Sequence, residues 1–148
     1  MIFNFVPYKS FGSLKFSMDR KTVRQCLGWS YIETSLDPFS KSVPADFFNK
    51  ELFVYYDHAG KCTAFEFAPA DANQIPIEVQ WNGENIFHAN YHDLLEYSRS
   101  IDNSIVINKV GFKCLKYGYG AWCPDYVYDK EMMPQSLIFF CKGYYDSE

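Results

Sequence analysis

Histidine is the side chain best suited to acid–base chemistry and metal binding near neutral pH, and the sequence contains three. His88 and His92 are four residues apart, the spacing at which one helix face can present two imidazoles to a metal ion. Asn90, which lies between them, is typical of a helix N-cap, and this would place His88 outside the helix. No His-Glu-x-x-His motif accompanies the pair. We therefore expect the polar surroundings of a helix N-terminus here, and no metal site.

A second arrangement that could do chemistry lies near the middle of the chain. His58 follows Asp57 and precedes Cys62 by four residues, so the stretch contains the elements of a cysteine–histidine nucleophilic pair. The same residues fall at the turn of a predicted hairpin, where a side chain is solvated and has no pocket to orient it. We expect a surface turn, and we keep a catalytic role for His58 only as the third hypothesis.

The remaining patterns for chemistry are weaker. The glycine-rich stretch Gly118–Ala121 matches neither of the common phosphate-binding patterns and is better explained by a bulge or a close backbone approach at the start of a strand. Carboxylates are scattered along the chain and suggest no pairing. The sequence therefore predicts that the protein is not an enzyme and has no cofactor.

The strongest candidate for recognition is residues 122–134, which combine one tryptophan, two tyrosines, two methionines and three carboxylates. Aromatic and methionine side chains are typical interface anchors, and acidic side chains attract a basic partner. The alternative is that the large side chains are buried and the acids are merely solvated. The predicted partner-binding residues are Trp122, Asp125, Tyr126, Tyr128, Asp129 and Glu131 from this segment, and Asp57, His58 and Glu66 from the hairpin.

Length and composition limit the classes of protein to consider. At 148 residues the chain has the size of one domain, so residues 1–148 are predicted to be a single domain. The formal net charge of −4 disfavours direct binding of nucleic acid. No window is long and apolar enough to span a membrane, and the first residues lack a signal-peptide pattern, so we expect a cytoplasmic protein without membrane contact. The five cysteines are irregularly spaced, which indicates buried thiols and not a disulfide framework.

The elements that must position these residues follow from capping and periodicity. Asp19 and Gly28 bracket a helix at 20–27 with Val23, Cys26 and Leu27 facing the core, and Asn90 begins a second helix at 91–101. A hairpin is predicted at 52–57 and 62–68, with Phe65 and Phe67 in the core. Further strands are predicted at 77–81, 104–107, 111–115, 118–122 and 136–143, with an Asn82-Gly83 turn, a loop at 69–76, and a long loop at 29–50 that allows one helical turn at 45–49.

These elements predict an α+β fold: a mostly antiparallel sheet of about five to seven strands with two or three short helices packed on one side. A helix followed by antiparallel strands recurs in residues 16–68 and 86–146. A weak internal duplication is one interpretation of this recurrence. The other is that any helix followed by a meander has the same appearance.

The residues at 9–28, the hairpin strands at 53–57 and 64–67, and the stretches 82–87 and 91–95 together resemble a group of small bacterial immunity proteins. These are encoded beside polymorphic toxins, including those of contact-dependent growth inhibition systems. The opening helix is also similar, more weakly, to the helix-plus-sheet module of the outer-membrane assembly lipoprotein BamE and the β-lactamase inhibitor protein. The resemblance implies a binding protein that blocks a cognate toxin and carries no shared catalytic residues.

Two functional hypotheses follow from the sequence. The first is a cytoplasmic immunity protein that binds a basic toxin domain, expected to be a nuclease, and occludes its active site or substrate surface. The second is a small-ligand or carbohydrate-binding module that uses exposed aromatic residues, for which Tyr117, Tyr119 and Trp122 are the candidates.

Overall fold

A computed structural model describes residues 2–36, 43–69 and 77–146. They form an α+β fold with mostly antiparallel sheets, which confirms the predicted fold class. The described part contains 12 strands in two sheets and 2 α-helices, whereas a single sheet of about five to seven strands was predicted. The predicted loop at 69–76 lies outside the described residues except for its first position.

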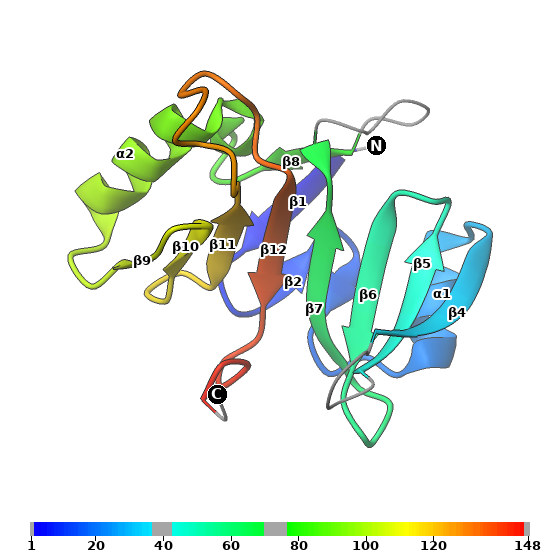
Figure 1. Ribbon diagram of the computed structural model, residues 1–148. Helices are drawn as coiled ribbons and strands as arrows, with labels where there is room; N and C mark the ends of the chain where they lie inside the picture. Colours follow the sequence, from blue (N-terminus) through cyan, green and yellow to red (C-terminus); the bar gives the residue numbers. More distant parts are fainter. Residues whose placement is uncertain (1, 37–42, 70–76, 147–148) are drawn as a thin grey trace.

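Eight strands form one antiparallel sheet (Figure 1). They are β4 (Tyr31–Leu36), β5 (Val43–Phe48), β6 (Leu52–Tyr56), β7 (Cys62–Phe67), β9 (Val106–Ile107), β10 (Gly111–Cys114), β11 (Tyr119–Trp122) and β12 (Ser136–Phe140). Their order across the sheet is β4-β5-β6-β7-β12-β11-β10-β9. The pairing of β7 with β12 therefore joins a meander from each half of the chain.

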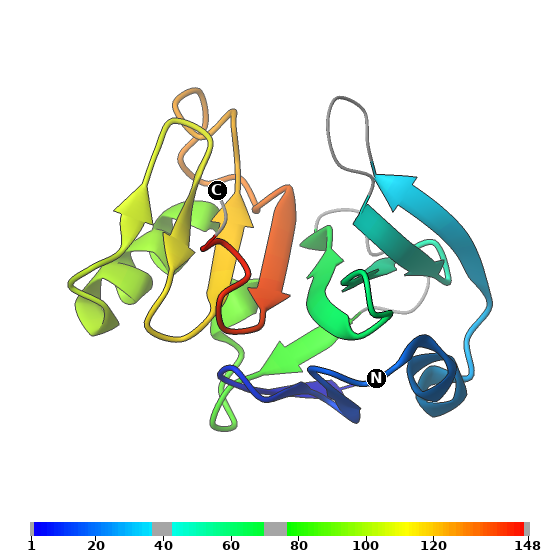
Figure 2. The ribbon, with the colours of Figure 1, turned by 90° about the horizontal axis from the view of Figure 1, so that it is seen from below.

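A smaller sheet packs against one face of the larger one (Figure 2). It contains β1 (Ile2–Val6), β2 (Ser10–Phe11), β3 (Leu14–Lys15) and β8 (Glu78–Gln80), in the order β3-β2-β1-β8. The pair β1 and β8 is parallel. The predicted turn after β8 is confirmed, because Asn82 and Gly83 both have positive φ and the backbones of Trp81 and Glu84 exchange two hydrogen bonds.

Both predicted α-helices are present with the predicted bounds: α1 (Arg20–Leu27) and α2 (Tyr91–Ile101). Asp19 caps α1 by accepting a hydrogen bond from the Thr22 backbone N–H at 2.8 Å, and Gly28 ends it in the left-handed region. Asn90 caps α2 in the same way through the Asp93 N–H, also at 2.8 Å. A single 3-10 turn, η2 (Ile86–His88), precedes α2.

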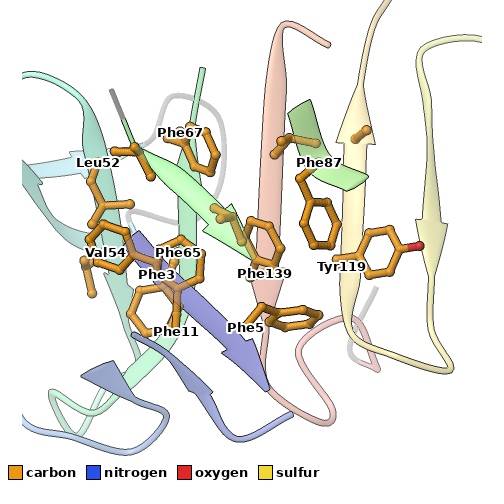
Figure 3. Packing of buried hydrophobic residues seen from close by; sticks show 14 of the residues in the cluster. Phe3, Phe5, Phe11, Leu52, Val54, Phe65, Phe67, Phe87, Tyr119 and Phe139 are labelled. Carbon is orange, nitrogen blue, oxygen red and sulfur yellow. The ribbon is translucent and has the colours of Figure 1, made fainter. Parts of the chain in front are cut away.

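The core lies between the two sheets and is dominated by aromatic side chains (Figure 3). Phe139 of β12 lies at its centre, with ring centroids 4.9 Å from those of Phe5, Phe11 and Phe87. Fully burying one such side chain stabilises the fold by roughly 1.5–3 kcal/mol. Both α-helices contribute to the same buried cluster, which places them on this side of the larger sheet.

Four of the five predicted core residues are buried, and Cys26 is the exception. Val23 and Leu27 of α1 are buried, as are Phe65 and Phe67 of β7. Cys26 is exposed. The helix has eight residues, and its buried side is formed by Val23 and Leu27 alone. Cys26, three residues after Val23, lies beside this narrow apolar stripe and is not covered.

The predicted long loop at 29–50 is wrong where the structure describes it, and so is the helical turn at 45–49. Residues 31–36 and 43–48 are paired strands. One residue of β5, Asp46, is charged and fully buried. Its carboxylate accepts hydrogen bonds from Arg24 Nε (2.9 Å), Arg24 Nη2 (2.8 Å) and the Tyr56 hydroxyl (2.9 Å). These bonds offset the cost of burying a charge, so a strand forms where the composition favours a turn.

The order of the elements contains a repeat that is more extensive than the predicted one. In the described residues, α1 is followed by the meander β4-β5-β6-β7, and α2 is followed by the meander β9-β10-β11-β12. The two meanders meet edge to edge through their last strands. This arrangement is compatible with an internal duplication, which remains a hypothesis.

Buried thiols and phenols predict a loss of stability at alkaline pH. Burial raises the pKa of Cys114 from 9.0 to about 12, and that of Tyr91 from 10.0 to about 12. An unfolded thiol loses its proton near pH 9 whereas the folded Cys114 keeps it. The contribution of Cys114 to the free energy of unfolding is therefore complete below pH 9. It decreases between pH 9 and pH 12 by about 1.4 kcal/mol per pH unit.

Urea unfolding at several pH values between 8 and 11 measures this slope. Cys114→Ala should unfold with a flatter pH dependence than the wild type, and the exposed Cys26→Ala should keep the wild-type slope. An unchanged slope in Cys114→Ala would show that this thiol does not carry the effect.

Candidate functional site

The second face of the larger sheet lies opposite to the main core, and we call it the open face. Part of it is covered, because Ala45, Tyr55, Ala64 and Phe140 form a smaller buried cluster there. The strand register places one residue of each strand in a single line across it. This line, which we call the open-face row, is Ile32, Phe47, Phe53, Glu66, Ile138, Gly120, Lys113 and Val106. Its ends are well exposed, at 58% for Ile32 and 44% for Val106. Apolar side chains thus span both halves of the sheet, and Glu66 is the one carboxylate among them.

Two adjoining hollows lie on the open face. The larger has a volume of about 800 Å³ and includes Phe53 and Met133 in its lining. The smaller has a volume of about 310 Å³ and lies over β10, β11 and β12. Glu66, Trp122 and Ser136 border both hollows, so the two adjoin at these residues, and together we call them the trough. It lies over the junction of the two meanders.

Stacked aromatic rings form the wall of the trough on the side of β5 and β6. The rings of Phe47 and Phe53 are 4.1 Å apart and nearly parallel, and the ring of Tyr55 continues the stack 6.0 Å beyond Phe53. Phe47 and Phe53 are partly exposed, although their neighbours on the other face belong to the core. Such stacking holds the rings in place and leaves a flat apolar surface for contact.

Glu66 lies on the floor of the trough and is held by two hydroxyl groups. Tyr55 donates a hydrogen bond to Oε1 at 2.5 Å, and Ser136 donates one to Oε2 at 2.6 Å. Burial, followed by the charge of Glu66, raises the pKa of Tyr55 well above its usual range, so this phenol remains a donor at neutral pH. The orientation of the carboxylate is therefore fixed before anything binds.

Trp122 forms the opposite side of the trough and is 48% exposed. Its cross-strand partner on β10 is Gly111, where a Cβ atom would lie 2.1 Å from the backbone oxygen of Ala121. At Gly120 a Cβ would lie 2.7 Å from the Phe112 oxygen, which confirms the predicted close backbone approach in this glycine-rich strand. Both glycines are therefore required by close backbone approach, and neither places a side chain beside the indole.

The predicted recognition segment borders the trough at the end where β11 and β12 meet it (Figure 1). Met132 and Met133 line the larger hollow. Tyr128 is 86% exposed. Three acids of the same segment, Asp125, Asp129 and Glu131, are exposed, and we call them the acidic rim. Both interpretations of the segment thus apply in part, since its methionines are half-buried while Trp122 and Tyr128 are accessible.

Tyr126 differs from its neighbours in the segment because it attaches the segment to α2. Its hydroxyl lies 2.7 Å from His92 Nδ1, and its ring centroid is 4.8 Å from that of Tyr91. The Met132 carbonyl also accepts a hydrogen bond from the Tyr91 N–H. These contacts assign Tyr126 a positioning role.

Asp57 and His58 lie at the turn between β6 and β7, at the end of the sheet opposite to residues 123–135 (Figure 1). Asp57 Oδ1 accepts hydrogen bonds from the backbone N–H groups of Ala59 and Lys61, both at 2.9 Å. The structure therefore brings Glu66 and Trp122 together and leaves Asp57 and His58 outside the trough.

The two other histidines occupy separate environments. His88 Nε2 accepts a hydrogen bond from the Val79 N–H at 3.0 Å, while His92 contacts Tyr126. Within the described residues, no group of three or more histidine, cysteine, aspartate or glutamate side chains is placed to hold a metal ion. No helix of this part of the chain has the length and apolar character needed to cross a membrane.

The aromatic set named for carbohydrate binding is divided between the two faces of the sheet. Tyr119 is fully buried on the core face, where its hydroxyl lies 2.6 Å from that of Ser98. Tyr117 packs against Trp81 of the core, with ring centroids 4.9 Å apart. Of the three, Trp122 alone lies on the open face. It shares the lining of the larger hollow with two phenylalanines, Phe47 and Phe53, that were not predicted.

Those phenylalanines, Phe47 and Phe53, are the main residues of the site that sequence reasoning missed. Phe47 falls in the segment that was interpreted as a loop. Phe53 lies in a correctly predicted strand, but the run of apolar residues from Leu52 to Tyr56 gives no indication of which face is exposed. The strand register of the predicted hairpin could have identified Phe53, because the pairing of β6 with β7 places it opposite Glu66.

Comparison with models of protein families, with curated proteins and with solved structures finds no match to this chain. The site is therefore interpreted from its own geometry and chemistry.

Proposed function

We propose that the protein binds and neutralises a cognate bacterial toxin through the trough and its acidic rim, as an immunity protein acting in the cytoplasm. The observation that carries the proposal is the open-face row, where aromatic and aliphatic side chains from both meanders lie at least partly exposed around one oriented carboxylate. Large apolar anchors surrounded by polar groups are the usual composition of a protein interface.

Charge supports a basic partner. The chain has a formal net charge of −4, and the rim contributes Asp125, Asp129 and Glu131 against Lys130. A nuclease carries a basic surface where it contacts its substrate, and an acidic inhibitor approaches such a surface faster than a neutral one. Occupation of that surface would block the substrate without any chemistry by the inhibitor.

The test is rescue of growth. The toxin domain encoded beside this gene is expressed from an inducible promoter in cells with and without the protein. Growth that returns only with the protein, together with co-purification of the two chains, supports the proposal. Continued killing by a toxic partner that is co-expressed with folded protein contradicts it.

A second candidate, a small-ligand or carbohydrate-binding module, is favoured by one observation. The larger hollow, at about 800 Å³, lies within the size range of ligand pockets and combines Trp122 with polar groups. Thermal unfolding in the presence of a panel of sugars tests it, because a ligand that binds the folded state raises the unfolding temperature. Stabilisation by the toxin domain and not by sugars would favour the first candidate.

A further inference from the structure

Glu66 occupies an unusual place for a carboxylate. In the open-face row its neighbours on the two adjacent strands are Phe53 and Ile138, both apolar. The salt bridges formed among the described residues do not include Glu66, and its two hydrogen bonds come from neutral hydroxyls. The carboxylate is partly exposed and has apolar residues on both adjacent strands, so it attracts a cation that enters the trough.

The two hydroxyls leave room for a cation. An ionised carboxylate offers about four acceptor positions, and Tyr55 and Ser136 each use one. One position on each oxygen therefore remains, which is the arrangement that a guanidinium group uses for two parallel hydrogen bonds. The same two hydroxyls prevent the carboxylate from turning away, so little orientation is lost on binding.

The walls favour a flat cation. Trp122 borders both hollows beside Glu66, and the Phe47–Phe53 stack lies on the other side. From β6 to β11 is three strand spacings, or roughly 14 Å between backbones, which admits an extended chain with its side chains. An arginine side chain stacks on aromatic faces and is more weakly hydrated than lysine.

Other charges along the trough lie away from its centre. Lys113 is three strands from Glu66 in the row, and its ammonium group lies 3.9 Å from the centroid of the Tyr145 ring. Lys50 and Glu51 line the larger hollow from the turn between β5 and β6, but not the smaller one. Among the charged residues that line the two hollows, Glu66 alone borders both, together with Trp122.

We infer that the trough is an arginine-recognition site: an extended segment of the partner inserts an arginine between Trp122 and Phe53 and pairs it with Glu66. This inference rests on the proposed function, since it names the chemistry by which the toxin is recognised. It makes Glu66 and Trp122 direct contacts and the hydroxyls of Tyr55 and Ser136 positioning groups.

The probe is a pair of short peptides that differ by one charge, acetyl-Gly-Arg-Gly-amide and its citrulline analogue, titrated against the labelled protein. The indole N–H resonance of Trp122, assigned with Trp122→Phe, reports binding. We expect saturable binding of the arginine peptide with a dissociation constant in the millimolar range, and at least about tenfold weaker binding of the citrulline peptide.

Glu66→Gln keeps the size of the side chain and one acceptor oxygen but removes the charge. This variant should therefore bind the arginine and citrulline peptides about equally. Asp57→Asn is the matched control, because it removes the same charge at the opposite end of β7 and should keep the preference. Equal binding of the two peptides, no saturable shift up to roughly 50 mM, or an unchanged preference in Glu66→Gln overturns the inference. Saturable binding of maltose without binding of the arginine peptide also overturns it.

The two proposals fail separately. If the protein rescues cells from the toxin while the peptides show no preference for arginine, toxin neutralisation stands and the arginine site is wrong. If rescue fails while the preference for arginine depends on Glu66, the site exists but the cognate toxin is not its partner.

Discussion

Asp46→Ala is expected to lower the free energy of unfolding by about 3–5 kcal/mol, the usual cost of removing one partner from a buried ion pair. The wild-type carboxylate is fully buried and accepts three hydrogen bonds, two from Arg24 of α1 and one from Tyr56 of β6. Without it, the buried Tyr56 hydroxyl loses this acceptor, and Glu33, which is exposed, is the carboxylate that still pairs with Arg24. Urea unfolding followed by circular dichroism measures the change.

Glu33→Ala is a matched control for this prediction. Both carboxylates accept from Arg24, at 2.7 Å for Glu33 and 2.8 Å for Asp46, but the Glu33 side chain is 61% exposed and that of Asp46 is 0% exposed. The exposed pair should contribute at most about 1 kcal/mol. If Asp46→Ala does not fold, Asp46→Asn, which retains one acceptor oxygen, should give a measurable intermediate loss. Equal losses in the Asp46 and Glu33 variants would contradict the importance of burial.

This ion pair also explains where prediction from the sequence succeeded and where it failed. The two α-helices were predicted to the residue, because caps such as Asp19 and Asn90 act on backbone groups a few positions away. The strand β5 was missed because the run Thr34–Pro44, which reaches into it, is typical of turns, and because residues 45–49 were interpreted as a possible helical turn. What keeps Asp46 in a strand is Arg24, 22 residues earlier in the chain. No local pattern contains that information.

The residues of the candidate site could be predicted only in part, because their contacts also join distant parts of the chain. Trp122 and Glu66 were both named from composition and local context, yet they are 56 residues apart and meet only because β7 pairs with β12. Ser136, which holds Glu66, is 70 residues from it. Contacts of this kind depend on how two meanders are joined, and a single sequence does not specify that junction.

Trp122→Ala should weaken the complex with the cognate toxin by about 2–4 kcal/mol, or roughly 30- to 1000-fold in the dissociation constant. The indole is 48% exposed in the free protein, borders both hollows and has no side chain beside it at Gly111. A partner that fills the trough would bury it fully, and buried tryptophans are common among residues that dominate binding. Titration calorimetry with the purified toxin domain measures the change, and an unfolding free energy within about 1 kcal/mol of wild type excludes a folding defect.

Charge variants locate the rest of the interface. Changing both Asp125 and Asp129 to lysine reverses the charge of the rim and should also weaken the complex by about 2 kcal/mol, mainly through slower association and with strong dependence on salt. Asp57→Lys makes a similar change at the opposite end of the sheet and should have little effect if the trough is the interface. Unchanged affinity in both the Trp122 and the rim variants would rule out the trough. Weaker binding by Asp57→Lys alone would move the interface to the turn between β6 and β7, where His58 would become the neighbouring contact.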